Sequence, residues 1–210
     1  MSILLDSASL KEAISVCELG FVRGITTNPG LMRTQTDDPL RHLEELLTAV
    51  DLAEIYYQPT GAYGPWLAEA EKAWSLDQDR VVLKLPATAH GAATAAEMVR
   101  RGAAVAFTAA QTAQSMIVAE AIGCTTVIPY LDRAIRDIRT ETRILQALQS
   151  VRRRPTRILV ASVKSVGQFE QAFQDGADAV TAPAAVLHQL LAHPAVIEAD
   201  QTFAAAYSGR

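Results

Sequence analysis

The chain has 210 residues, of which 50% are hydrophobic and 20% are charged, and its net charge at pH 7 is −4. This composition is typical of a globular protein and excludes a disordered chain, while the mild negative charge argues against a general nucleic-acid surface. The basic cluster at 152–154 with Arg157 is short and follows a helical pattern, so we interpret it as a solvated helix end. Cys17 and Cys124 are isolated, which argues against a structural zinc site or a disulfide framework.

The sequence also argues against a membrane protein. No apolar run reaches the ~18–20 residues that a membrane-spanning helix needs, and the N-terminus lacks the pattern of a secretory signal. We therefore expect a cytoplasmic protein without a membrane partner.

Short apolar runs alternate with helical patterns along the chain. The runs predict strands at 3–6, 21–26, 53–58, 81–85, 103–108, 125–130, 157–162 and 179–181. The helical patterns start near residue 9 and then cover 39–50, 65–76, 91–101, an alanine-rich stretch ending at Gly123, 138–151, 166–174, 184–192 and 194–207. The strands are ~20–30 residues apart, which is the spacing of βαβ units.

This repeat favours a closed (β/α)8 barrel, the TIM barrel, over an open doubly wound sheet. The open sheet usually has about five or six strands and a glycine-rich phosphate turn after the first one. Neither Gly-x-Gly-x-x-Gly nor Gly-x-x-x-x-Gly-Lys occurs in the sequence. We predict one barrel domain over 1–210, with 194–210 as an extra C-terminal helix.

The fourth predicted strand carries a lysine between aliphatic residues. Its sequence, Val-Val-Leu-Lys-Leu at 81–85, is typical of a strand buried on both faces, and Pro86 marks its end. A Lys charge is unfavourable in an apolar interior, and the usual response is a lowered pKa. A lysine that is neutral near pH 7 is a nucleophile toward carbonyl carbon. The alternative is that Lys84 reaches water at the strand end or pairs with a carboxylate.

Polar residues lie at or beside the ends of the other predicted strands. They are Asp6, Thr26, Thr27, Asn28, Gln58, Thr108, Tyr130, Ser162 and Thr181. In a (β/α)8 barrel the C-terminal strand ends form the active site, so these groups should converge around Lys84. The chain has four lysines against fifteen arginines, and two of the four, Lys84 and Lys164, are at strand ends. This scarcity favours selection for an amine at Lys84.

Several motifs resemble those of the transaldolase family, in particular its small bacterial branch, which includes fructose-6-phosphate aldolase. The motifs are Leu-Asp-Ser-Ala at 5–8, Gly-Ile-Thr-Thr-Asn-Pro at 24–29, Val-Leu-Lys-Leu-Pro-Ala-Thr at 82–88, Pro-Tyr-Leu-Asp-Arg at 129–133 and Ala-Ser-Val-Lys at 161–164. The match runs along nearly the whole chain. The resemblance implies a class I aldolase barrel, a Schiff-base lysine at Lys84 and sugar phosphate substrates. This chemistry needs no metal and no organic cofactor.

The implied reaction assigns roles to the strand-end residues. We expect Asp6 and Tyr130 to move protons, and Gln58 and Thr108 to hold a water molecule between them. For Asp6 the alternative is a carboxylate at a helix N-terminus or on the barrel floor, and Tyr130 could be a core residue.

Substrate binding is expected from a second group of residues. Arg133 offers a bidentate fork for a phosphate, Ser162 a hydroxyl and Lys164 a point charge; the alternative for the two cations is a surface salt bridge. Thr27 and Asn28 are predicted to contact substrate, or else to shape a turn at Asn28-Pro29.

In the family that the chain resembles, the transferase branch has Glu and Phe at the positions of Gln58 and Tyr130. The aldolase branch has Gln and Tyr there. The chain is therefore similar to the aldolase at both positions. It departs from the family pattern at Ala106, at 59–61 and at Ile128, where the pattern has a small or hydroxyl residue. These departures leave the donor and acceptor open. They also keep a second hypothesis, a catalytically idle barrel that binds sugar phosphates or serves assembly.

The C-terminal segment carries an apolar stripe of its own. Val196, Ile197, Phe203 and Tyr207 recur at helical or near-helical intervals, so they must be buried on something. The helix could fold over its own barrel. The family resemblance implies instead a ring-type homo-oligomer, such as a pentamer or decamer, in which the helix reaches a neighbour.

Overall fold

The computed structural model describes residues 1–61, 65–132 and 143–208. Within these residues, eight parallel strands pair in chain order, and β1 pairs with both β2 and β8 to close a barrel. The strands are β1 (Ser2–Asp6), β2 (Val22–Thr26), β3 (Glu54–Tyr57), β4 (Val81–Pro86), β5 (Val105–Ala110), β6 (Thr126–Pro129), β7 (Arg157–Val160) and β8 (Ala179–Ala182). The predicted (β/α)8 barrel is confirmed.

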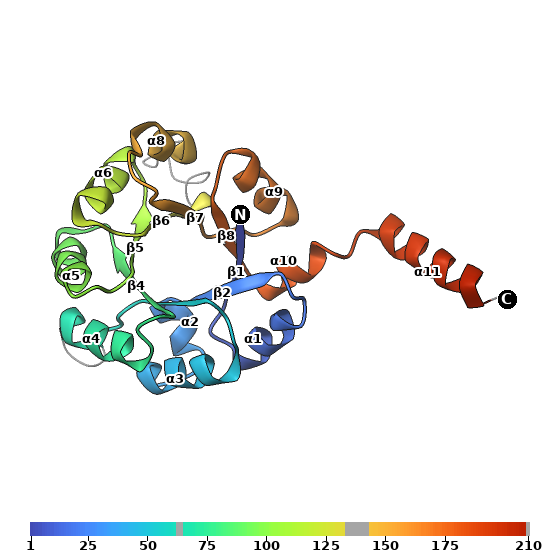
Figure 1. The fold of residues 1–210 in the computed structure, drawn as a ribbon, viewed down its shortest axis with the longest axis horizontal. Helices are drawn as coiled ribbons and strands as arrows, with labels where there is room; N and C mark the ends of the chain where they lie inside the picture. Colours follow the sequence, from blue (N-terminus) through green and yellow to red (C-terminus); the bar gives the residue numbers. More distant parts are fainter. Residues whose placement is uncertain (62–64, 133–142, 209–210) are drawn as a thin grey trace.

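The helices form a ring outside the strands (Figure 1). They are α1 (Leu10–Cys17), α2 (Pro29–Arg33), α3 (Pro39–Ala49), α4 (Trp66–Leu76), α5 (Ala89–Arg100), α6 (Ala113–Ile122), α8 (Ile144–Val151), α9 (Val166–Gln174) and α10 (Ala184–Gln189), followed by α11 (Pro194–Ser208). The helix predicted over 138–151 is helical from Ile144, and its earlier part lies outside the described residues. None of the described helices has the length and apolarity that a bilayer crossing requires.

The short helix α2 corrects the sequence prediction, which placed a turn and a loop after β2. Asn28 is the N-cap of α2, and its side-chain oxygen accepts a 3.0 Å hydrogen bond from the backbone N–H of Leu31. Pro29 occupies the first turn, where its missing N–H has no consequence and its fixed φ suits a helix. The Asn-Pro pair was therefore a helix start signal.

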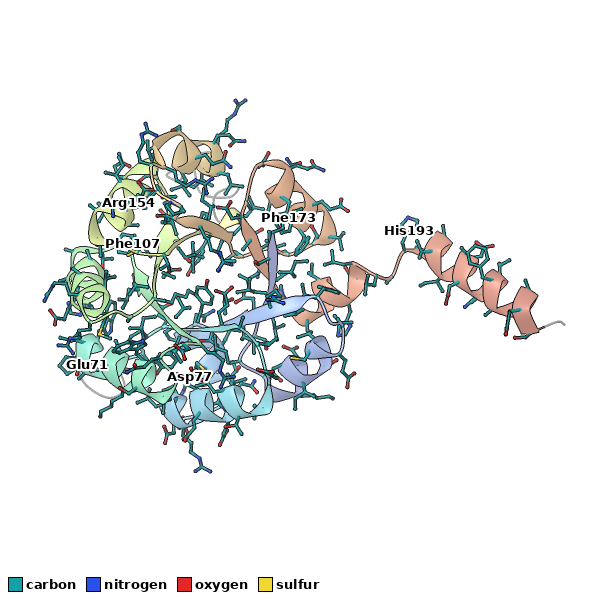
Figure 2. The ribbon with its side chains drawn as sticks, in the orientation of Figure 1. Glu71, Asp77, Phe107, Arg154, Phe173 and His193 are labelled. Atoms are coloured by element: carbon teal, nitrogen blue, oxygen red, sulfur yellow. The ribbon has the colours of Figure 1, made fainter. Side chains whose placement is uncertain are left out.

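The side chains of the strands form two separate apolar cores. The inner core fills the barrel and consists of Leu4, Tyr56, Val82, Ala106, Ile128, Leu159, Ala161 and Ala179, with Ala104 and Tyr130 packed against it. The outer core lies between strands and helices and contains the alternate strand residues, such as Leu83 and Leu85 of β4. Figure 2 shows side chains filling the centre of the strand ring. Because neighbouring strand residues point to opposite faces, Lys84 shares the inner face with Val82.

An ion pair closes the N-terminal end of the barrel. The guanidinium of Arg157, at the start of β7, donates two hydrogen bonds of 2.9 and 3.1 Å to the carboxylate of Glu54, at the start of β3. The Tyr56 hydroxyl donates a third, of 2.9 Å, to the same carboxylate. Arg157 was predicted to belong to a solvated helix end, and this was wrong. Gly24 leaves the space for Glu54, since a Cβ there would lie 2.5 Å from the Glu54 carbonyl oxygen.

Helix α11 does not fold over its own barrel. It follows His193 and extends away from the ring on the side of α1 and α10 (Figures 1 and 2). None of its residues is buried, and the exposed fractions of Phe203 and Tyr207 are 72% and 82%. The helix predicted at the C-terminus is confirmed. The alternative in which this helix folds over its own barrel is wrong.

Candidate active site

A cavity of about 410 Å³ opens at the C-terminal ends of the strands. Eight of the ten site residues named from the sequence line it: Asp6, Asn28, Gln58, Lys84, Thr108, Tyr130, Ser162 and Lys164. They come from seven different β-strands or the segments that follow them, so the barrel alone brings them together. Four small or ring-shaped residues complete the wall: Pro29, Pro86, Ala109 and Ala161.

Lys84 is the buried cation of this cavity. Its exposed fraction is 2%, and its side-chain nitrogen donates a 2.8 Å hydrogen bond to the backbone carbonyl oxygen of Thr27. Burial lowers the pKa of Lys84 from 10.5 to about 8, and the negative charge of Asp6 partly offsets this effect. At pH 7 a usable fraction of Lys84 is therefore the neutral amine.

Asp6 ends β1 and faces the same cavity. Its Oδ1 accepts a 3.0 Å hydrogen bond from the Thr26 hydroxyl, which also lies 2.7 Å from the Thr181 hydroxyl. Helix α1 has Ser9, not Asp6, as its N-cap, and Asp6 lines the cavity at the C-terminal ends of the strands. Both alternative positions weighed for Asp6 are thereby excluded by the geometry, which leaves a carboxylate beside Lys84.

A polar pair lies on the β5–β6 side of the cavity. The Thr108 hydroxyl donates a 3.2 Å hydrogen bond to the Tyr130 hydroxyl. Gln58 comes from the end of β3, and its side-chain oxygen Oε1 is buried without a hydrogen-bond partner among the described residues. Since buried acceptors are normally satisfied, this oxygen marks a place where a water or substrate hydroxyl would bind.

The rim of the cavity holds the remaining polar groups. Ser162 and Ala109 have positive φ angles of 64° and 58°, and both line the cavity. Non-glycine residues in this region are strained by about 1–3 kcal/mol each, and such residues cluster at functional sites. Lys164 is exposed beyond Ser162, and Asn28 uses its side-chain oxygen to cap α2, which leaves its amide nitrogen for a ligand.

A family model described as Transaldolase/Fructose-6-phosphate aldolase matches residues 3–208. The chain belongs to this family. The "Probable transaldolase" of Brevibacillus brevis is 32% identical over 201 residues, which cover 92% of each chain. The "Probable transaldolase" of Brucella melitensis is 29% identical over 211 residues, which cover 98% of this chain and 95% of that one.

A solved structure gives an independent view of the fold. The crystal structure of 3-hexulose-6-phosphate synthase matches with a TM-score of 0.65 and 18% identity over 90% of this chain and 96% of that chain. At this identity the likeness shows the barrel fold alone. Membership of the transaldolase/aldolase family itself supports aldolase-type chemistry on sugar phosphates.

Thr27, named from the sequence, does not line the cavity. The Thr27 hydroxyl is fully buried and donates a 2.8 Å hydrogen bond to the carbonyl oxygen of Tyr56, so Thr27 contributes its backbone carbonyl to Lys84 instead. Arg133 lies outside the described residues. Its role in phosphate binding stays a prediction.

Two of the three departures from the family pattern, Ala106 and Ile128, lie in the barrel interior. Ala106 and Ile128 are both fully buried members of the inner core, and neither lines the cavity. Tyr130, which lines the cavity, packs against this inner core. Ala106 and Ile128 can therefore affect the cavity only through the packing of this core.

Sequence reasoning missed the walls of the cavity and one hydroxyl. Ala109, Ala161 and Pro86 carry no reactive group, so their types gave no signal. Thr181 was noted at a strand end but was not assigned to the site; its contact with Thr26 joins positions 155 residues apart in the chain. Among the described residues, no group of three or more His, Cys, Asp and Glu side chains could hold a metal ion.

Proposed function

We propose that the protein is a Schiff-base (class I) transaldolase or aldolase, which cleaves or transfers a dihydroxyacetone-type three-carbon unit between sugar phosphates. The observation that carries the proposal is Lys84: a lysine buried on the inner face of the barrel, at the cavity, with a pKa of about 8. The lowered pKa raises the neutral fraction of the amine near pH 7 by about 300-fold relative to an ordinary lysine.

In the proposed reaction, the neutral amine of Lys84 adds to the C2 carbonyl of a fructose 6-phosphate-like donor. The carbinolamine takes up a proton on its hydroxyl and loses water, which gives a protonated imine. The positive nitrogen then accepts the electron pair of the C3–C4 bond. The C4 hydroxyl loses its proton as the bond breaks, and an aldehyde and a lysine-bound enamine result.

Asp6 is the proposed base for the C4 hydroxyl. It faces the cavity beside Lys84, and one of its oxygens is held by Thr26 while no described residue donates to Oδ2. Oδ2 is therefore the oxygen that can accept the C4 proton. The same proton can return to an acceptor aldehyde when the reaction runs toward bond formation, as microscopic reversibility requires.

Gln58, Thr108 and Tyr130 are proposed to hold the water of imine formation and hydrolysis. The unpartnered Oε1 of Gln58 offers an acceptor, and the Thr108–Tyr130 pair offers a hydroxyl that is already oriented. The Tyr130 hydroxyl can donate a proton to a water bound between these groups. Phosphate binding is proposed for Ser162 and Lys164 on the rim, together with Arg133.

Transferase and free aldolase differ in what the enamine meets next. The curated relatives are named probable transaldolases, whereas Gln58 and Tyr130 resemble the aldolase branch. We infer that the enamine takes up a proton at C3 and that water then hydrolyses the resulting imine to free dihydroxyacetone, because Gln58, Thr108 and Tyr130 are suited to hold that water. Comparing fructose 6-phosphate turnover with and without an aldose phosphate acceptor distinguishes the two activities.

We further propose a ring-type homo-oligomer, such as a pentamer or decamer, built with α11. Its apolar side chains Val196 and Phe203 are exposed by 62% and 72% in the single chain. An apolar stripe of this length is stable in water only when another surface covers it. Since the helix points away from its own barrel, the covering surface is proposed to belong to a neighbouring copy (Figure 1).

Borohydride reduction in the presence of fructose 6-phosphate tests the activity. It should convert the imine into a stable amine, seen as a mass increase on the peptide that contains Lys84. Borohydride without substrate is the control. If borohydride and fructose 6-phosphate give no adduct while calorimetry shows that the protein binds sugar phosphate, the hypothesis of a catalytically idle barrel is favoured over that of an enzyme.

A further inference from the structure

Thr181 lies next to the site without touching its cavity. It is on β8, its exposed fraction is 0%, and its hydroxyl oxygen lies 2.7 Å from that of Thr26. This is its one side-chain hydrogen bond among the described residues. Thr181 is not part of the cavity wall. Any effect of its hydroxyl on a bound substrate must therefore pass through Thr26.

The direction of this hydrogen bond follows from counting hydrogens. The Thr26 hydroxyl has one hydrogen, and an ionised Asp6 can only accept. The hydrogen of Thr26 is therefore used in the 3.0 Å bond to Asp6 Oδ1. In the 2.7 Å contact, Thr26 must then be the acceptor and Thr181 the donor. The two hydrogen bonds therefore run in one direction: Thr181 donates to Thr26, and Thr26 donates to Asp6.

We propose that Thr181 is a positioning residue, which acts through Thr26 to fix the Asp6 carboxylate and to keep its Oδ1 occupied as an acceptor. The inference rests on the proposed function, in which Asp6 takes the C4 proton. A donated hydrogen bond from Thr181 makes Thr26 a better donor in turn, because consecutive hydroxyl hydrogen bonds polarise one another. The C4 proton is then exchanged at Oδ2, the oxygen to which no described residue donates a hydrogen bond.

Loss of Thr181 should release this arrangement. Without a donor from β8, the Thr26 hydroxyl can rotate away from Oδ1, and Asp6 can turn or take its proton on the oxygen that is remote from substrate. A positioned acid or base contributes about 10²–10⁴-fold to a rate, so partial loss of its orientation should reduce turnover by about 10-fold. Phosphate binding on the rim should not change.

Steady-state kinetics on three variants test the proposal. Thr181→Val keeps the shape of the side chain and removes the hydroxyl, and it should lower kcat for fructose 6-phosphate cleavage by about 10-fold while KM changes less than about 2-fold. Thr181→Ser restores the hydroxyl and should recover most of kcat. Thr126→Val is the matched control. Thr126 is also a buried barrel threonine, but its side chain is hydrogen-bonded to Tyr56, whose hydroxyl contacts Glu54 at the N-terminal end of the barrel. This control should leave kcat unchanged.

A double-mutant cycle separates positioning from a general structural role. Thr26→Val alone and Thr26→Val combined with Thr181→Val should have the same kcat, because Thr181 acts only through Thr26. Additive losses, or an unchanged kcat in Thr181→Val, would overturn the inference while the function stands. An inactive wild-type protein that traps no substrate would instead overturn the proposed function, and the role of Thr181 with it.

Discussion

The side-chain nitrogen of Lys84 donates its 2.8 Å hydrogen bond to the carbonyl oxygen of Thr27, just past the end of β2. Thr27 is itself held, because both its hydroxyl and its N–H donate to the carbonyl oxygen of Tyr56, at 2.8 and 3.0 Å. The amine is thus anchored by backbone that cannot easily move. In its neutral form, one N–H points at Thr27, which restricts the direction of the lone pair that must attack a carbonyl.

Lys84→Met should abolish both turnover and borohydride trapping, because the nucleophile is lost. Methionine is of similar length and apolar, so the buried position should tolerate it. Activity assays and mass spectrometry of reduced samples measure the effect. Lys11→Met is the matched control at an exposed lysine and should trap normally. Trapping that persists in Lys84→Met would make Lys164 the nucleophile, and the Lys164→Met variant would show it.

The same substitution should change the pH dependence of stability. The folded pKa of Lys84, about 8, lies below its unfolded value near 10.5, so the unfolded chain binds more protons between these two values. Wild-type stability should therefore rise through this pH window relative to Lys84→Met. Below pH 8 the buried charge should destabilise the wild type by about 3 kcal/mol, at ~1.36 kcal/mol per unit. Urea unfolding of both proteins at pH 7 and pH 10 measures the difference; an equal difference at both pH values contradicts the prediction.

Arg133→Ala should weaken the binding of phosphorylated substrates. A charge-assisted pair between guanidinium and phosphate is lost only for these substrates, so their KM should rise by about 10-fold or more while KM for unphosphorylated analogues stays nearly constant. Arg154→Ala, at an exposed arginine, is the control. Equal losses for both substrate classes would show that Arg133 has a structural role instead.

Glu69→Gln should destabilise the segment that follows β3 and carries Gln58. The Glu69 carboxylate is fully buried and accepts hydrogen bonds from the Tyr57 hydroxyl, from the N–H and hydroxyl of Thr60 and from the N–H of Gly61, at 2.7–2.9 Å. Burial would raise the pKa of Glu69, but these hydrogen bonds outweigh it and lower the pKa. An amide at this position turns one acceptor into a donor that faces donors, which costs about 2–4 kcal/mol.

Thermal unfolding at pH 7 measures the loss. The pKa of Glu69 is lower folded than unfolded, so its stabilisation is complete above the unfolded value of ~4.3 and is lost as the pH falls through the folded one. The gap between wild type and Glu69→Gln should therefore shrink at acid pH. Glu71→Gln, two residues away on the exposed side of α4, is the control and should change stability by less than about 1 kcal/mol.

The strands were readable from sequence because each is a short apolar run, and β4 and β6 were found within one residue of their ends. The fifth strand was expected at 103–108 and lies at 105–110 instead. Alanines at 103, 104, 106, 109 and 110 suit any environment, so they set no boundary. A register irregularity near Ala109, where φ is positive, was likewise invisible in the sequence.

The site was predictable as far as the barrel determines it. The position of Asp6 and Lys84 at strand ends follows from parallel strands in a closed ring. The orientation of Thr27 does not, because the alternation of faces stops where the strand ends, and hydrogen bonds to Tyr56 decide which group faces Lys84. The pairing of Arg157 with Glu54, 103 residues apart, also required the folded chain.

Truncation after His193 tests the role of α11 in assembly. The barrel closes through β1 and β8 without α11, and no residue of the helix is buried, so the truncated barrel should still fold. Light scattering of the full chain should show a multimer, and the truncated chain should form smaller species. A full-length variant with Phe203→Ser and Tyr207→Ser keeps the helix but removes its two most exposed aromatic side chains, and should weaken the multimer in the same way. Far-UV circular dichroism controls for folding. If truncation leaves the mass of the assembly unchanged, apart from the residues removed, the subunits meet through the barrel faces and α11 has no part in holding them together.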